Sequence, residues 1–202
     1  MKNFVYAMMM SLGILSSVVV GRVAHASDWV LDTDHSQVGF SIRHMMVSNV
    51  KGHFAQFSGN VMVDEKDLTK STVSASIDVA SLDTGNAKRD AHLKSPDFFD
   101  AVKFPTMTFK STKVEKDGAG LKITGDLTIH GITKSVVLAV TNFTEEVKDM
   151  MGMARRGASA TCVAKRKDFG LIWNKVLDGG GVALGDDVMI QIDVEMMKKP
   201  NG

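Results

Sequence analysis

The chain has 202 residues, of which 44% are hydrophobic and 23% are charged, and its formal net charge is +1 at pH 7. This near-neutral balance offers no basic surplus for nucleic acid or an anionic membrane surface. The single cysteine, Cys162, has no partner within the chain, so the fold must be stabilised by its core instead of a disulfide. Because no linker or low-complexity segment divides the chain, we expect one domain.

The first 26 residues are typical of a secretory signal peptide. Lys2 precedes an apolar stretch over residues 4–20, and Ala-His-Ala at 24–26 fits a small-x-small cleavage site. A retained anchor is the alternative, but the stretch is somewhat short for a membrane span. Cleavage would leave residues 27–202 with 22 basic and 23 acidic side chains, because it removes Lys2 and Arg22 but no acid. We expect a single mature domain in the periplasm, without stable membrane insertion.

Alternation of apolar and polar residues with a period of two predicts the strands. In the first strand, Val38, Phe40 and Ile42 share one face. The predicted strands cover residues 38–42, 57–63, 73–79, 107–114, 121–129, 136–143, 158–164 and 188–194. Eight antiparallel strands with one apolar face predict an all-β fold, either a closed barrel or a two-sheet sandwich.

Many of the side chains on the apolar face of the predicted strands are unusually small. Small residues occupy this face at Gly59, Ala75, Gly125, Ala158, Ala160, Cys162 and Ala164. Since packed protein interiors leave little void, a barrel lined by small residues should hold another molecule. The alternative is a sandwich in which small residues let the facing strands approach closely.

Residues 84–103 interrupt the strands with a polar, helix-like insert. Residues 86–93 can form two helical turns, and Ser95-Pro96 indicates the N-cap and first position of a further short helical turn.

Two interpretations of this insert remain open. It is a lid at a barrel mouth, where Phe98 and Phe99 enter the cavity and Arg89 or His92 lies near a ligand head. Alternatively it is a plug whose phenylalanines are ordinary core residues.

Four motifs in order along the chain carry a resemblance to a known family. They are Asp34-His35-Ser36-x3-Phe40-x2-Arg43-His44, Arg89-Asp90-Ala91-His92-Leu93 followed by Phe98-Phe99, Gly125-Asp126-Leu127-Thr128-Ile129-x-Gly131, and Arg166-x-Asp168-Phe169-Gly170-Leu171. From about Trp29 to about Met196 the chain resembles the YceI-like family of bacterial lipocalin-like, polyisoprenoid-binding proteins. The resemblance implies an extended eight-stranded antiparallel lipocalin-like barrel with a long hydrophobic cavity and a short helical insert at one end. Ala158 departs from the family pattern, where a Phe is usual, and this leaves the shape of the ligand open.

The inward strand positions, the insert and the expected rim together define a ligand-binding site. We expect the ligand to contact Phe40, Ile42, His44, Phe57, Ala75, Ile77, Arg89, His92, Phe98, Phe99, Phe109, Leu127, Ala160, Cys162 and Trp173. Period two places His44 on the inner face, where its imidazole must find a ligand head or a backbone carbonyl. Arg166 and Asp168 are expected to form a pair that orders a loop. The expected partner is a polyisoprenoid or another long-chain lipid, such as one with a quinone-like tail, and a homodimer remains an open alternative.

Catalysis finds little support in the sequence. There is no nucleophile elbow and no His/Cys spacing typical of a metal site, so we expect no catalytic residue, metal or cofactor. Three alternatives stay open. One is an enzyme that acts on the lipid through His44, Arg89 or His92, and another is a structural or stress-related protein whose barrel is filled by its own side chains. The third is a copper site built from Met45 and Met46, which His44 and His53 flank, together with Met150, Met151 and Met153.

Overall fold

The computed structural model describes residues 26–200, so the predicted signal peptide lies outside the described residues except for Ala26. The strands are β1 (Ala26–His44), β2 (Ser48–Phe54), β3 (Phe57–Asp64), β4 (Thr72–Asp78), β5 (Leu82–Asp83), β6 (Thr106–Asp117), β7 (Gly120–Ile129), β8 (Ile132–Val140), β9 (Val147–Lys148), β10 (Ala154–Lys165) and β11 (Leu184–Lys198). The helices are α1 (Ala87–Lys94) and the short 3-10 helices η1 (Leu68–Lys70), η2 (Val79–Ser81) and η3 (Arg166–Phe169).

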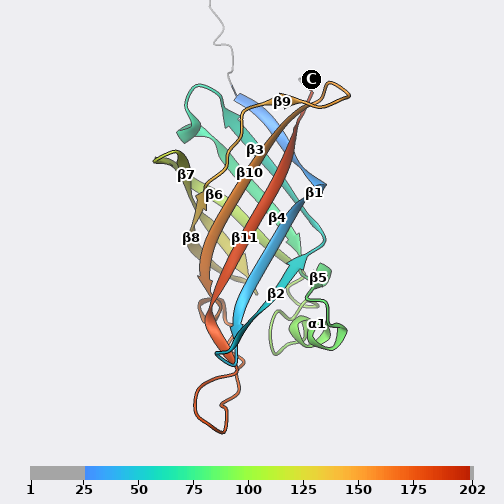
Figure 1. Ribbon diagram of the computed structural model, residues 1–202, viewed down its shortest axis with the longest axis vertical. Helices are drawn as coiled ribbons and strands as arrows, with labels where there is room; N and C mark the ends of the chain where they lie inside the picture. The colour runs from blue at the N-terminus through green and yellow to red at the C-terminus, as the bar shows by residue number, and fades with distance from the viewer. Residues whose placement is uncertain (1–25, 201–202) are drawn as a thin grey trace, which may run out of the picture.

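Eight of these strands close into an antiparallel barrel (Figure 1). The order around the barrel is β1, β3, β4, β6, β7, β8, β10 and β11, and the pairing of β11 with β1 closes the circle. These are the eight predicted strands, so the barrel is confirmed and the sandwich alternative is wrong. The predicted bounds of β8 are wrong because His130 and Gly131 form a tight turn with positive φ, which lets the strand begin at Ile132.

The long strand β1 changes the side that it presents to the barrel interior. Trp29 and Leu31 face inward at odd positions, whereas Val38 and Phe40 face inward at even positions. An alternating strand can switch parity only by an irregularity. The register with β11 shifts between Asp32 and Gln37, and this bulge lets both halves of β1 contribute apolar side chains to one core.

The outer edge of β1 pairs with two different strands. Its first residues pair with β3, and the segment from Val38 to His44 pairs with β2. The strand β2 was not predicted, because the turn between β1 and β2 consists of Met45, Met46 and Val47 and carries no Gly, Asn or Asp as a turn signal.

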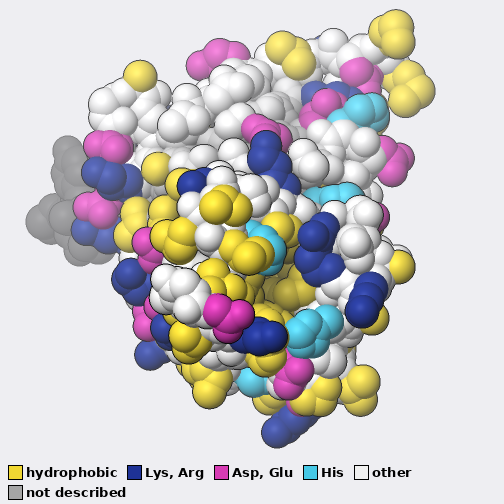
Figure 2. All heavy atoms as spheres, turned by 60° about the horizontal axis from the view of Figure 1, so that its bottom comes forward, with side chains coloured by type: hydrophobic (Ala, Val, Ile, Leu, Met, Phe, Trp, Pro, Cys, Tyr) yellow, Lys and Arg dark blue, Asp and Glu magenta, His cyan; other side chains and the backbone are white. Residues whose placement is uncertain are grey.

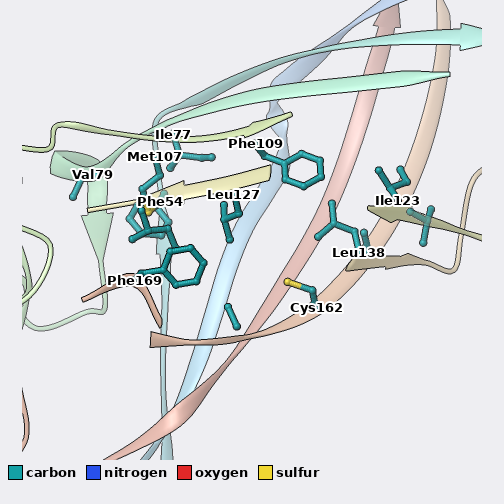
Figure 3. Close-up of a cluster of buried hydrophobic side chains, with 14 of the residues drawn as sticks. Phe54, Ile77, Val79, Met107, Phe109, Ile123, Leu127, Leu138, Cys162 and Phe169 are labelled. Carbon is teal, nitrogen blue, oxygen red and sulfur yellow. The ribbon is translucent and has the colours of Figure 1, made fainter. Parts of the chain in front are cut away.

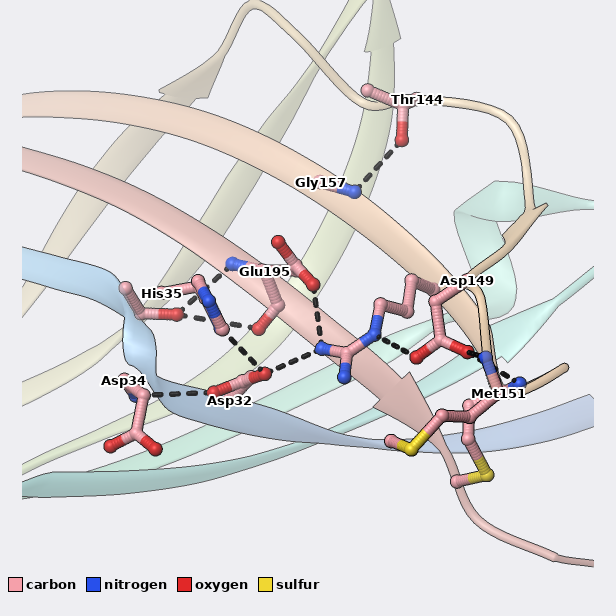
Figure 4. A network of polar contacts seen from close by, with 11 residues as sticks. Asp32, Asp34, His35, Thr144, Asp149, Met151, Gly157 and Glu195 are labelled. Carbon is pink, nitrogen blue, oxygen red and sulfur yellow. Dashed lines mark hydrogen bonds and ion pairs between the residues drawn. The ribbon is translucent and has the colours of Figure 1, made fainter.

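An ion network holds the bulge of β1 against its neighbours (Figure 4). The guanidinium group of Arg155 on β10 donates to Asp32, to Glu195 on β11 at 2.6 Å and to Asp149 at 2.7 Å. The bond from Arg155 to Asp32, together with one from His35, lowers the pKa of the Asp32 carboxyl to about 2. The same Arg155 lowers the pKa of Asp149, whose carboxylate also accepts from the backbone of the β9–β10 turn.

The polar insert forms α1 at one end of the barrel. Asn86 caps the helix by accepting from the backbone N–H of Arg89, as expected for two helical turns there. Ser95 ends α1 and also begins the predicted short turn over residues 96–99, because its hydroxyl accepts from the backbone N–H of Asp97 at 3.4 Å and its carbonyl accepts from that of Phe98 at 3.0 Å. Within residues 26–200, no helix has the length and apolar character that a membrane span requires.

The opposite end of the barrel is sealed by a tryptophan. Trp29 is fully buried and packs with Val63 and Met196. The guanidinium group of Arg156 lies over the rings of Trp29 and Phe143, with 5.3 and 5.2 Å to the ring centroids. Because an aromatic face attracts a cation, this stack closes the barrel without leaving the buried charge isolated.

We predict that the Arg155 network makes stability depend on pH at the acid end. The folded-state pKa of Asp32 lies below its ordinary value of 3.8, so the network stabilises the fold above about pH 4, and the contribution is lost as the pH falls toward 2. Arg155→Gln should therefore lower Tm most near neutral pH, and the difference from wild type should shrink below about pH 3.

Circular dichroism melts across this pH range test the prediction. Lys165→Gln is the matched control, because Lys165 pairs with Asp187 in an exposed salt bridge that should contribute little. A Tm deficit of Arg155→Gln that stays constant with pH would contradict the prediction.

Candidate ligand-binding site

A cavity of about 330 Å³ occupies the barrel interior. Its wall is almost wholly apolar, and Figure 3 shows that side chains such as Phe109, Leu127 and Cys162 point inward from different strands. The volume falls within the range of roughly 300–1,000 Å³ that is common for small-molecule sites. The barrel is therefore not filled by its own side chains, in contrast to the packed-barrel alternative.

The cavity opens at the end that carries α1. Figure 2 looks toward this end and shows hydrophobic side chains inside a hollow, with basic and histidine side chains around it. His44 and Leu184 pair across β1 and β11 at this end, and both line the cavity. We refer to this end as the mouth and to the Trp29 end as the closed end.

All but two of the predicted ligand-binding residues line the cavity. Those that do are Phe40, Ile42, His44, Phe57, Ala75, Ile77, Arg89, Phe98, Phe99, Phe109, Leu127, Ala160 and Cys162. Their contact with a ligand stays a prediction.

His92 and Trp173 lie behind the cavity wall. The His92 imidazole bonds to Asp97 at 2.9 Å, and its ring stands edge-on to Phe98 and Trp173. The rings of Phe98 and Trp173 are 5.2 Å apart. Both predicted residues therefore pack against Phe98 and do not themselves line the cavity.

The few polar groups on the wall are donors rather than carboxylates. Among the described residues that line the cavity, the charged side chains are Arg89 and Arg166, and no Asp or Glu is present. Arg89 donates to the hydroxyl and the carbonyl of Thr84, and Asp90 accepts from the same Thr84. These bonds fix Arg89 at the mouth, where a hydrogen-bond acceptor on a ligand would find it.

Arg166 was predicted to pair with Asp168, and this prediction is wrong. Its side chain is buried and donates to the carbonyls of Gly185, Leu171 and Trp173, and its nearest carboxylate is Asp186 at 3.4 Å. Burial lowers the pKa of Arg166. The sequence held a signal for this, because the alternation of inward residues on β10 from Ala158 to Ala164 continues to position 166.

The small inward residues do not all create space. A Cβ atom added to Gly125 would overlap the Phe109 ring and approach the carbonyl oxygen of Lys110 to 2.7 Å, and one added to Gly59 would overlap Leu31. These glycines make room for neighbouring side chains of the protein. The expectation that every small inward residue leaves space for a ligand is therefore wrong for Gly59 and Gly125. Ala158, Ala160 and Ala164 of β10 do line the cavity.

We predict that Gly125→Ala destabilises the barrel by about 1–3 kcal/mol, because the new methyl group overpacks against Phe109 and backbone. Gly39→Ala is the matched control in a strand. Its Cβ would meet only backbone oxygens at 3.6 Å, so the change should stay within about 0.5 kcal/mol. Urea unfolding of both variants measures the difference, and equal free energies of unfolding would contradict the prediction.

The geometry gives no support to a copper site made of the two methionine groups. Met45 and Met46 lie at the mouth, and Met150, Met151 and Met153 lie at the β9–β10 turn beyond the closed end (Figure 1). Asp32, His35 and Glu195 do bring possible ligand atoms together.

The guanidinium group of Arg155 already donates to the carboxylates of Asp32 and Glu195, so their negative charge is balanced without a metal ion.

Cys162 is buried among apolar side chains, and burial raises the pKa of its thiol to about 11. At neutral pH this thiol is protonated and behaves as a small apolar group.

A closed antiparallel barrel with an apolar cavity that opens at one end defines the class of lipocalin-like barrels. Residues 29–196 match the YceI-like domain, and the chain belongs to the YceI-like family. A UPF0312 protein of Vibrio cholerae serotype O1 is 38% identical over 166 residues, which cover 81% of this chain and 87% of the relative.

Two solved structures illustrate the fold. The YceI protein of Campylobacter jejuni superposes with a TM-score of 0.67 at 36% identity, covering 84% of this chain and 97% of that structure. A domain from Saccharophagus degradans, described as polyisoprenoid-binding, superposes with a TM-score of 0.58 at 14% identity, covering 85% of this chain and 98% of that domain. At that identity the second likeness concerns the fold.

Proposed function

We propose that the protein is a periplasmic carrier that holds a long apolar molecule, a polyisoprenoid lipid or a quinone-like tail, inside the barrel. The continuous apolar wall from Met196 near the closed end to Leu184 at the mouth is the observation that carries the proposal. The solved domain of this fold that is described as polyisoprenoid-binding agrees with it. Export to the periplasm rests on the signal-peptide pattern of residues 1–26.

The energetics favour a long chain over a small ligand. Burying one CH₂ group contributes about 0.8 kcal/mol, so ten such groups contribute on the order of 8 kcal/mol. Association itself costs about 4–15 kcal/mol, and a neutral hydrogen bond returns only about 1 kcal/mol net. Affinity should therefore come mainly from the wall, which a short molecule would leave partly uncovered.

The arrangement of the ends gives the ligand a direction. Trp29 and Arg156 close one end, and the donors His44, Arg89 and Arg166 lie on the wall toward the other. An apolar tail would enter first, and a head group with hydrogen-bond acceptors would stay near the mouth. An enzyme that acts on the same lipid remains the second candidate, with His44 and Arg89 placed to reach the head.

We predict that native mass spectrometry of the protein from its own periplasm detects a bound lipid and that Ala160→Trp reduces this signal at least tenfold. The indole ring would fill ligand volume, since Ala160 points into the cavity. Val163→Trp is the matched control, because Val163 lies on the same strand but is exposed on the outside. It should keep the lipid.

Three outcomes would count against the carrier. The first is that the wild-type protein binds no apolar chain of any length. The second is that both tryptophan variants lose the lipid, and the third is that the mass of the bound lipid changes with time of incubation. The last outcome would favour the enzyme. Circular dichroism checks that each variant keeps its β structure.

We also predict that the mature chain begins at Ser27. The Ser27 hydroxyl accepts from the Trp29 indole and donates to Glu65, so β1 needs its residues from this position onward. Intact mass measurement of the periplasmic fraction checks the cleavage site. A chain that still carries Met1 and sediments with membranes would show that the segment is a retained anchor.

A further inference from the structure

The turn between β1 and β2 has an unusual composition for its backbone. Met45 and Met46 have φ values of 47° and 59°. Two consecutive positive φ values are what a type I′ hairpin turn requires, and the residues that favour it are Asn-Gly and Asp-Gly. Side chains with a Cβ atom adopt this region at a cost, and methionine lacks the local hydrogen bonds that help Asn and Asp.

The same turn exposes its apolar side chains instead of burying them. Met45, Met46 and Val47 are 45%, 57% and 75% exposed. The fold therefore gains little packing from these residues and also bears the backbone cost of the turn. Such a combination at one place suggests a use outside the fold.

A second loop places further apolar side chains beside this turn. Ile172 and Val176 are largely exposed, and Val176 forms an isolated β-bridge with Val182. The backbone N–H of Met45 donates to the carbonyl of Ala183 at 2.7 Å, which joins the two loops. We define the apolar tips as these exposed side chains: Met45, Met46, Val47, Ile172, Val176 and Val182.

The apolar tips lie at the mouth of the cavity. The β1–β2 turn directly follows His44 and the second loop directly precedes Leu184, and both of these residues line the cavity. In Figure 1 the loop before β11 extends past the barrel along its long axis. A surface that the tips enter would thus lie against the opening.

The charges near the tips have a modest basic surplus, although the whole chain is nearly neutral. Residues 43–51 and 165–187 contain six basic side chains against four acidic ones, and two of the acids, Asp186 and Asp187, pair with Lys167 and Lys165. Arg43 donates to the carbonyl of Met46, so its guanidinium group is held behind the tip of the turn. Apolar side chains at the front with cations behind them match the layers of a bilayer surface, where acyl chains lie beneath anionic head groups.

We propose that the apolar tips dock the mouth of the barrel onto a phospholipid bilayer that contains anionic lipid, so that the ligand passes between membrane and cavity without crossing water. The proposal rests on the carrier function for its purpose, but docking can be measured without any cargo. The tips project from two loop ends with cations beside them, which suits insertion between lipid head groups.

Flotation of the purified full protein with vesicles of phosphatidylethanolamine and phosphatidylglycerol tests docking. The double variant Met45→Asn, Met46→Gly removes both exposed side chains and supplies the residues that the turn favours. We expect vesicle binding to fall at least tenfold while Tm stays equal or rises. High salt or vesicles of phosphatidylcholine alone should weaken binding by wild type.

The matched control removes two methionines from the other end of the molecule. Met150 and Met151 are also highly exposed, but they lie at the β9–β10 turn beyond the closed end. The double variant Met150→Asn, Met151→Asn should float with vesicles as wild type does. Docking through the mouth is overturned if this control loses binding, if the mouth variant keeps it, or if wild type does not float.

Two further measurements separate docking from the carrier function and from self-association. Calorimetric titration with farnesol should give the same affinity for wild type and the mouth variant, because the tips do not line the cavity. Failure of wild type to bind farnesol or longer prenols counts against the carrier, whereas lost vesicle binding with intact farnesol binding supports docking. A wild-type dimer that becomes monomeric in the mouth variant would show that the tips contact a second copy, which overturns the proposal.

Discussion

Closure of the barrel depends on β1, because this strand pairs with β11 along one edge and with both β3 and β2 along the other. Its inward residues change from odd to even positions between Leu31 and Val38, so the geometry of an alternating strand requires the bulge between them. Arg155 makes the bulge stable by binding Asp32 together with carboxylates from β11 and the β9–β10 turn. Without the register shift at this bulge, the two halves of β1 could not line one continuous cavity.

The two ends of the barrel differ, because one is closed and the other is open. At the closed end, Trp29 and Arg156 exclude water by stacking an apolar ring under a paired cation. At the mouth, α1 and its turn cover part of the opening with Phe98 and Phe99, while Arg89 is fixed by Thr84. Because of this asymmetry the cavity opens at one end only. The exposed methionines of the β1–β2 turn lie at that same end.

Period-two alternation predicted the eight barrel strands well, because a strand with one buried face must alternate whatever its partners are. It failed at β2, where Met45 and Met46 provide no turn signal, and at Gly125, where the space belongs to Phe109. It also missed the role of Arg166, although the alternation along β10 reaches it. For Gly125 the deciding fact is its contact with Phe109 on the neighbouring strand, and for Arg166 it is the set of backbone carbonyls that the following loop brings to its side chain.

The sequence by itself determined the all-β architecture, the apolar inner face, the short helix within residues 86–93 and the resemblance to the YceI-like family, since periodicity, helical spacing and motif order are local properties. Only the tertiary structure decided that the sheet closes, which end is sealed and that His92 and Trp173 lie behind the wall. Those features depend on register, on the bulge of β1 and on side-chain packing across strands. Local patterns do not encode such relations, because they arise only when distant segments are brought together.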